Sequence, residues 1–165
     1  MRAAALLLVL LTLAGCGGTV QVDPPVPSGE AVAACDKLAT LLPATLDGDE
    51  RGESTPESPY VAVWGSGTIA LRCGVSRPAR MAPTDRLQEI GGVGWFADPE
   101  RPTLFTAVTD TAYVEVTVGG EHVAGEVLTE LSEPVGRLSP QPSTQPSTQP
   151  STQPSSAQPS SAQTG

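Results

Sequence analysis

The sequence has very few of the side chains on which most catalytic and metal sites depend. It contains one histidine, His122, one lysine, Lys37, and no asparagine. A single imidazole excludes a histidine-rich metal centre. The excess of 18 acidic over 9 basic side chains argues against nucleic acid as a partner, because phosphates are held by clustered Lys and Arg. A GC-rich genome explains the scarcity of lysine and asparagine, so we give these absences no functional meaning.

The N-terminus has the three-part form of a secretory signal. Arg2 precedes an apolar stretch over residues 3–13, which is too short for a membrane-spanning helix of about 20 residues. Leu13-Ala14-Gly15-Cys16 follows and has the form of a bacterial lipobox. We predict that residues 1–15 are a cleaved signal peptide and that Cys16 is the acylated first residue of the mature chain. Two or more acyl chains hold a protein stably at a membrane, so we expect it on the outer face of the cytoplasmic membrane.

Two segments of low complexity flank the rest of the chain. Residues 16–28 contain three prolines and no amphipathic period, which is typical of a tether. Residues 139–165 consist of Pro, Gln, Ser, Thr, Ala and one Gly, with Gln-Pro-Ser-Thr three times in succession. This composition cannot form a core and predicts a disordered tail, either neutral, O-glycosylated or in contact with wall polymer. A single globular domain is then expected over residues 29–138.

The region between these segments predicts an α+β domain. Helices are expected over residues 29–42, after Ser28 as N-cap, and over residues 121–132, ending before Pro134. Five short stretches between them are rich in β-branched or aromatic residues and predict strands: 60–64, 68–75, 93–96, 103–108 and 112–118. We expect a small antiparallel sheet of about five strands with both helices on one face, a hairpin across residues 109–111, and a mobile loop over the acidic residues 46–59.

Cys35 and Cys73 are the two cysteines that remain when Cys16 is acylated. An exported protein normally oxidises such a pair. Cys35 lies on the apolar stripe of the first predicted helix, and Cys73 shares a strand face with Leu71, so both sulfurs are expected to point into the same interior. The pair lacks the Cys-x-x-Cys spacing of a redox site. We therefore expect one disulfide between the first helix and a strand.

The sheet face opposite the helices is expected to carry a mixture of rings and charges. Trp64, Arg72, Tyr113 and Glu115 are the candidates for a binding face there, since rings supply contact area and arginine supplies directed donors. The alternative is a solvated cross-strand pair of Arg72 and Glu115, with Trp64 belonging in part to the core. His122 has no partnered nucleophile motif and is expected to be a surface histidine.

Several short motifs resemble one family. The motifs are Cys35-x-x-Leu38, Leu71-Arg72-Cys73-Gly74-Val75, Gly92-Val93-Gly94-Trp95 and Tyr113-Val114-Glu115-Val116. Over residues 33–132 the chain resembles domain-of-unknown-function family 3515, lipoproteins of high-GC Gram-positive bacteria. The resemblance implies an exported lipoprotein and brings no established activity.

Export signals without catalytic motifs favour a non-enzymatic function. We expect a binding or scaffolding module of the cell envelope, attached to the membrane by lipid, with an envelope protein or wall polymer as its partner. The alternative is an enzyme, or an accessory subunit, of wall metabolism in which a carboxylate such as Asp110 or Glu115 performs acid/base chemistry; this requires a second carboxylate nearby in a cleft. No catalytic residue, cofactor or metal is predicted, and the sequence does not indicate an oligomeric state.

Overall fold

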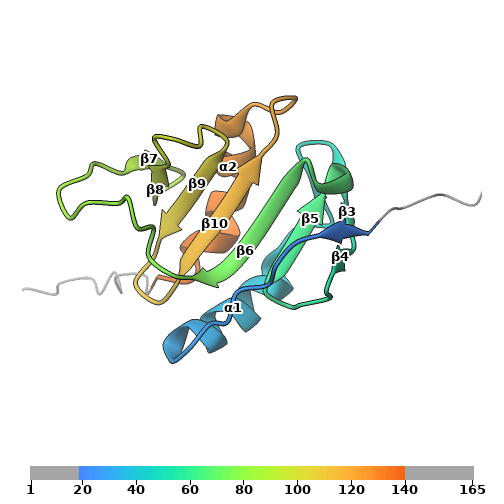
Figure 1. Cartoon of the computed structure of the whole chain (residues 1–165), viewed down its shortest axis with the longest axis horizontal. Helices are drawn as coiled ribbons and strands as arrows, with labels where there is room; N and C mark the ends of the chain where they lie inside the picture. The colour runs from blue at the N-terminus through green and yellow to red at the C-terminus, as the bar shows by residue number, and fades with distance from the viewer. Residues whose placement is uncertain (1–18, 140–165) are drawn as a thin grey trace, which may run out of the picture.

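The computed structural model describes residues 19–139, which form one large sheet with two helices against it (Figure 1). The predicted signal peptide, Cys16 and the tail after Ser139 lie outside the described residues. The strands are β1 (Val20–Gln21), β2 (Thr45–Leu46), β3 (Asp49–Gly52), β4 (Ser54–Thr55), β5 (Val61–Trp64), β6 (Ile69–Val75), β7 (Gln88–Ile90), β8 (Val93–Ala97), β9 (Leu104–Val108) and β10 (Tyr113–Val118). The helices are α1 (Glu30–Leu41) and α2 (Ala124–Gly136). Neither of them is long and apolar enough to cross a membrane.

The main sheet has eight strands in the order β2-β3-β5-β6-β10-β9-β8-β7, and all neighbouring pairs are antiparallel. The α+β class, the antiparallel arrangement and the β9–β10 hairpin are therefore confirmed. The expected number of strands, about five, was too low. The five predicted strands are β5, β6, β8, β9 and β10, and the missed strands β2, β3 and β7 lie at the two edges. Edge strands are short and polar, so their composition resembles that of loops.

The acidic segment 46–59 is consequently not a loop. Asp47 and Gly48 have φ angles of 49° and 86° and form the tight turn between β2 and β3. Two positive φ angles in a two-residue connection are typical of an Asp-Gly hairpin, because this backbone geometry matches the twist of the flanking strands. Once the turn forms, β3 adds to β5, and Arg51 pairs with Trp64 in the sheet.

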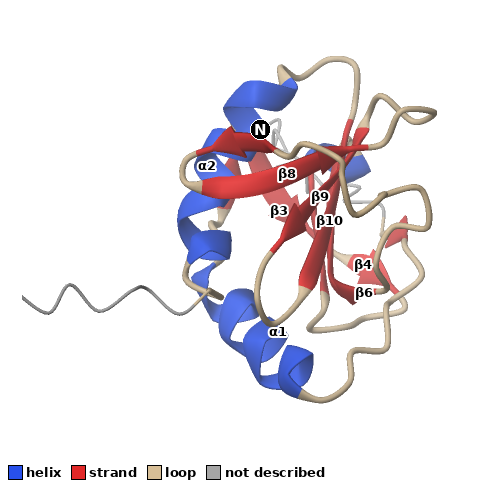
Figure 2. Cartoon of the chain, turned by 90° about the vertical axis from the view of Figure 1, so that its left-hand side faces the viewer, coloured by secondary structure: helices blue, strands red, loops and turns tan. Residues whose placement is uncertain are grey.

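Both helices cover one face of the sheet, as predicted (Figure 2). Alternate residues of the central strands point toward them, and Leu71, Val114 and Val116 are fully or almost fully buried there. The disulfide between Cys35 of α1 and Cys73 of β6 is confirmed, with a Cα–Cα distance of 5.6 Å. Both helix boundaries differ from the sequence expectation. Gly29 rather than Ser28 is the N-cap of α1, and α2 begins at Ala124 and continues through Pro134.

The presence of Pro134 inside α2 has a local reason. Proline removes one backbone donor and is poorly tolerated in the middle of a helix, but Pro134 lies in the last turn of α2, which ends at Gly136. Pro134 is also buried, as are Leu131 and Val135 beside it. Apolar burial against the sheet therefore extends the helix past the position where the sequence pattern predicts its end.

The described part of the predicted tether belongs to the fold. Residues 19–28, which we call the N-terminal strap, lie on the sheet face away from the helices. The strap contains β1, which pairs in parallel with β4. The N–H groups of Val20 and Val22 donate to the carbonyls of Glu53 and Thr55 at 2.9 and 3.1 Å. The described fold therefore begins close to Val20 instead of at residue 29, because the carbonyls of Glu53 and Thr55 accept hydrogen bonds from this proline-bearing segment.

Candidate functional site

Two segments cover the flanks of the sheet face away from the helices, which we call the open face. On one side the strap follows β6: a Cβ atom added at Gly67 would overlap Val20, and one added at Gly74 would overlap Pro27. On the other side Leu87, the residue before β7, lies against Gly94 of β8, since a Cβ atom at Gly94 would overlap the side chain of Leu87. In Figure 1 the strap, in blue, passes in front of the sheet, whereas α2 lies behind it. The middle of the open face, on β6 and β10, remains between the two coverings.

Arg72 and Glu115 lie in this middle region. They are directly opposite each other on β6 and β10, and Arg72 Nη1 donates to Glu115 Oε1 at 2.8 Å. The two side chains are 33% and 17% exposed. Arg72 Nε also donates to the backbone carbonyl of Asp23 in the strap, at 3.0 Å. The predicted cross-strand pair is therefore present, and the arginine also links the strap to the sheet.

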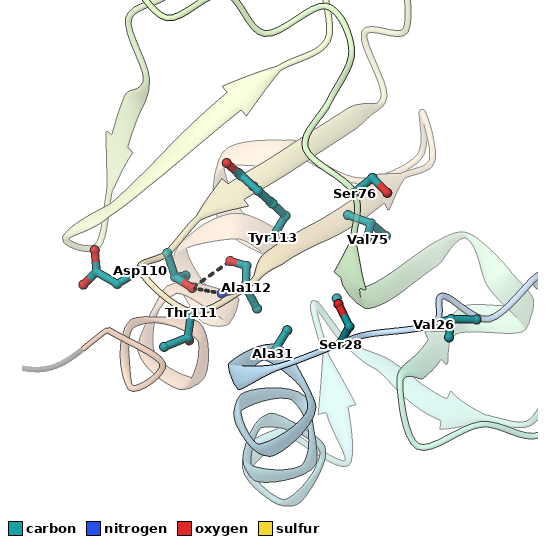
Figure 3. Close-up of a pocket in the computed structure, with 11 residues that line it drawn as sticks. Val26, Ser28, Ala31, Val75, Ser76, Asp110, Thr111, Ala112 and Tyr113 are labelled. Atoms are coloured by element: carbon teal, nitrogen blue, oxygen red, sulfur yellow. Dashed lines mark hydrogen bonds between the residues drawn. The ribbon is translucent and has the colours of Figure 1, made fainter.

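Tyr113 lies two residues before Glu115 on β10, beside a cavity at the end of the sheet (Figure 3). The cavity has a volume of about 270 Å³. Three stretches of the chain form its wall. They are the strap and the start of α1, with Val26, Ser28 and Ala31; the end of β6, with Gly74, Val75 and Ser76; and the β9–β10 turn with the start of β10, from Thr109 to Tyr113. Hydroxyl and backbone groups dominate the wall, and Asp110 is the one carboxylate among its residues.

The β9–β10 turn that forms one wall of the cavity is fixed by its own hydrogen bonds. Thr109 Oγ1 donates to the carbonyl of Ala112 at 2.7 Å and accepts the N–H of Ala112 at 3.1 Å. Asp110 lies at the tip of this turn, and Ser28 and Ala31 lie across from it (Figure 3). Because the turn and the start of α1 are far apart in the sequence, only the tertiary fold brings these groups to one site.

Trp64 is not on the open face, so its predicted place in the binding face was wrong. It pairs with Ile69 across β5 and β6, and directly opposed residues of antiparallel strands project to the same side of a sheet. Ile69 faces the helices, and Trp64 is therefore 0% exposed in the core, where Nε1 donates to the carbonyl of Pro43 at 3.2 Å. The alternative interpretation of Trp64 as a core residue is correct.

His122 is also not a surface residue, since its side chain is only 10% exposed. Its Nδ1 lies 2.8 Å from Asp47 Oδ2, and its Nε2 lies 3.1 Å from Asp49 Oδ2. Thr68 Oγ1 is 3.1 Å from the same Nε2 and donates to Asp49 Oδ2 at 3.2 Å. These four residues, which we call the His122 cluster, join the β2–β3 hairpin, the start of β6 and the loop before α2.

The His122 cluster has the order of groups found in some hydrolytic sites, a hydroxyl, an imidazole and a carboxylate. The hydroxyl of Thr68, however, already donates to Asp49, and none of the four residues lines the cavity at the β9–β10 turn. Within residues 19–139, no group of three or more His, Cys, Asp or Glu side chains is arranged to hold a metal ion. We therefore interpret the cluster as a link between three segments.

The contacts of His122 were missed because they are not local. His122 and Asp47 are 75 positions apart in the sequence, so no motif of fixed spacing connects them. The one available signal was Asp47-Gly48, which indicates a tight hairpin between two short strands. This hairpin places Asp47 and Asp49 on the same edge of the sheet.

Asp98 is the one described residue with a resolved change in pKa. Burial of its side chain by itself raises the pKa of this carboxyl. Hydrogen bonds from the Arg101 side chain and from the backbone N–H groups of Glu100 and Arg101 stabilise the carboxylate and outweigh the burial, so the pKa of Asp98 lies below its ordinary value of 3.8. Asp98 thus fixes the turn between β8 and β9 and lies away from the cavity.

The fold and these sites define a class: an antiparallel α+β domain, stabilised by one disulfide, with a small polar cavity at one end of its open face. The sequence model of a family described as "Protein of unknown function (DUF3515)" matches residues 2–143. The chain belongs to this family, and the match extends beyond the motifs of residues 33–132 at both ends. No curated protein and no solved structure matches the chain.

Proposed function

We propose that this protein is a lipoprotein on the outer face of the cytoplasmic membrane, where it binds or scaffolds another component of the cell envelope without chemically changing it. The anchoring half of the proposal is supported by the lipobox Leu13-Ala14-Gly15-Cys16 after a short apolar stretch. The binding half is supported by the open face, where Arg72 and Glu115 form an ion pair and Tyr113 lines the cavity.

The single observation that carries the binding half is the position of Tyr113. Tyr113 lines the cavity and lies two residues before Glu115 on β10, where Glu115 forms a partly exposed ion pair with Arg72, so an aromatic residue, a charged pair and a hollow lie close together. Tyrosine and arginine are enriched among the residues that dominate binding interfaces. The cavity, at about 270 Å³, is just below the size of pockets that enclose a drug-sized molecule, roughly 300–1,000 Å³. It fits one side chain or one small polar group of a larger partner.

The anchoring half is tested by the intact mass of the protein purified from the membranes of its native host. We expect the mass of residues 16–165 plus a diacylglyceryl group on Cys16. The matched variant Cys16→Ala should keep its signal peptide or be released from the membrane fraction. A native chain that lacks acyl mass at Cys16 would contradict the anchoring half.

The binding half is tested by site-specific photo-crosslinking in intact cells. A photoreactive phenylalanine analogue at Tyr113 should crosslink to one envelope component. The same analogue at Glu133, an exposed residue of α2 on the helix side of the domain, serves as control and should give no such product. Identical products from both positions, or none from Tyr113, would contradict binding at the open face.

The alternative, an enzyme or accessory subunit of wall metabolism, has less support from the described geometry. Acid/base chemistry by two carboxylates requires both in one cleft. Glu115 is paired with Arg72, and Asp110 is the one carboxylate in the cavity beside Tyr113. Glu53 and Glu57 line a second hollow of about 570 Å³, but both are exposed to solvent, so neither has the buried surroundings that a general acid requires. Release of a soluble product from purified cell wall by the native protein, abolished by Asp110→Asn, would favour the enzyme over the binding module.

A further inference from the structure

The strap places the predicted lipid anchor close to one particular end of the domain. Val20 is already hydrogen-bonded to Glu53, and Thr19 is the first described residue. Three peptide units connect Cys16 to Thr19, and in any conformation they span at most about 11 Å. The end of the domain that holds Val20 can therefore not move far from a bilayer that contains the acyl chains of Cys16.

The residues at this end are known from their contacts. Val20 lies against Gly67 in the β5–β6 turn, and the N–H of Gly119 donates to the carbonyl of Thr68 at 2.7 Å. The β5–β6 turn, the start of the loop before α2 and the His122 cluster thus lie together at the end of β6 where Ile69 begins the strand. We call this the anchor end.

The cavity and the C-terminal end of the domain lie at the other end of β6. Gly74, Val75 and Ser76 line the cavity, and β6 has seven residues, which corresponds to about 20 Å along the strand. The hydroxyl of Thr111 in the β9–β10 turn donates to the carbonyl of Leu138 at 3.1 Å. Figure 1 shows the chain entering the domain at one end and leaving it toward the other.

We infer that the anchored domain has a defined orientation, with the anchor end against the lipid headgroups and the cavity, Tyr113 and the start of the C-terminal segment facing away from the membrane. This inference rests on the proposed lipid anchor. It identifies the partner at Tyr113 as a component on the wall side of the domain instead of a lipid or a segment buried in the bilayer.

The orientation comes from the short connection and the strap, not from attraction to headgroups. Asp47, Asp49, Glu53 and Glu121 lie at or next to the anchor end, where they outnumber Arg51 of β3. Their negative charges do not attract an anionic membrane surface. The strap itself is held along β6 by the hydrogen bonds of Val20 and Val22 and by the contact of Arg72 with Asp23.

The test uses the full acylated chain in phosphatidylcholine vesicles that contain a lipid with a nitroxide on its headgroup. Glu53→Cys at the anchor end and Asp110→Cys at the opposite end form a matched pair, because each replaces one exposed acidic residue. Each introduced thiol can be labelled with a small fluorophore, since Cys16 carries the acyl group and Cys35 is bonded to Cys73. We expect the label at residue 53 to be quenched several-fold more strongly than the label at residue 110.

A second pair of variants tests whether the short connection between Cys16 and Thr19 causes the orientation. Ten Gly/Ser residues inserted between Gly17 and Gly18 add a flexible connection with an end-to-end distance of about 17 Å and should remove the difference in quenching. The same insertion after Ser139 should leave the difference intact. A difference that survives the first insertion would overturn the role of the short connection.

Equal quenching at both positions, stronger quenching at residue 110, or no quenching of an acylated chain would overturn the orientation while the lipid anchor stands. A chain without acyl mass that does not float with the vesicles would overturn the anchor and the orientation together. The two failures are thus distinguished by the mass of the same sample.

Discussion

Gly65 is the position at which a single methyl group should disturb the His122 cluster most directly. It lies in the β5–β6 turn with a φ angle of +54°, and a Cβ atom added there would overlap Asp49 Oδ2 and Thr68 Oγ1. Gly48 provides the matched control, because its φ angle of +86° is also positive but a Cβ atom there would have no neighbour within 4 Å. Gly48→Ala therefore measures the backbone cost alone, and Gly65→Ala adds the displacement of Asp49.

The magnitudes follow from these contacts. An alanine in the left-handed region costs about 1–2 kcal/mol, and part of this is offset by the lower entropy of the unfolded chain, so we expect Gly48→Ala to lower the free energy of unfolding by about 1 kcal/mol. Gly65→Ala also breaks the hydrogen bonds of Asp49 to Thr68 and His122, which together add about 2 kcal/mol. For roughly 120 ordered residues these losses correspond to Tm decreases of about 4 and 12 °C.

Urea unfolding followed by tryptophan fluorescence measures both variants, and a double-mutant cycle isolates the contact. In an Asp49→Ala background the main obstacle to the new methyl group is gone, so Gly65→Ala should cost about 1–2 kcal/mol less than in the parent protein. If Gly65→Ala and Gly48→Ala destabilise the protein equally, or if the effects of Gly65→Ala and Asp49→Ala are additive, the packing of Asp49 against Gly65 is not as described.

The remaining predictions concern the core and the acid stability. Replacing both Cys35 and Cys73 by alanine removes a link across 38 positions and should lower the free energy of unfolding by about 3.9 kcal/mol; a loss below about 1 kcal/mol in urea titrations would show that the unfolded chain is not constrained by the link. Ser132→Ala leaves the indole N–H of buried Trp95 without its acceptor and should cost about 1–3 kcal/mol, whereas Ser132→Thr, which keeps the hydroxyl, should cost less if the hydrogen bond dominates. Because the pKa of Asp98 is lowered in the folded protein, its contribution to stability is present above the unfolded value near 3.8 and is lost as the pH falls through the folded pKa. Asp98→Asn should therefore be destabilised relative to the parent at pH 7 and approach it at low pH; a difference independent of pH would contradict this account.

Much of the central fold follows from local patterns. Alternating apolar residues predict β6 and β10, and the same period of two, with the apolar stripe of the first helix, places Cys35 and Cys73 in one interior. The open-face positions of Arg72 and Glu115 also follow, because each strand was assigned to the correct residues within one or two positions. These features are predictable because the spacing of apolar residues along a single strand or helix shows which of its faces is buried.

The edge strands of the sheet and the position of the strap cannot be predicted from such local patterns. Strands β3 and β7 are rich in Gly, Asp, Glu or Gln, β2 has only two residues, and all three are strands because a neighbouring chain segment supplies hydrogen bonds. The face of Trp64 depends on the register of β5 against β6, since a shift of one residue moves every side chain to the opposite face. A sequence pattern over four residues does not determine that register.

The sequence by itself determined that this chain carries the motif Leu13-Ala14-Gly15-Cys16 and a low-complexity C-terminal segment, that its domain is α+β, and that Cys35 and Cys73 are partners, since each of these is encoded in consecutive residues or in a single period. Only the tertiary structure decided that the strap lies on the open face, that His122 joins two aspartates, and that the cavity lies at the end of the sheet opposite Val20. These features depend on contacts between segments far apart in the chain, and such contacts form only when burial of the core fixes the order and register of the strands.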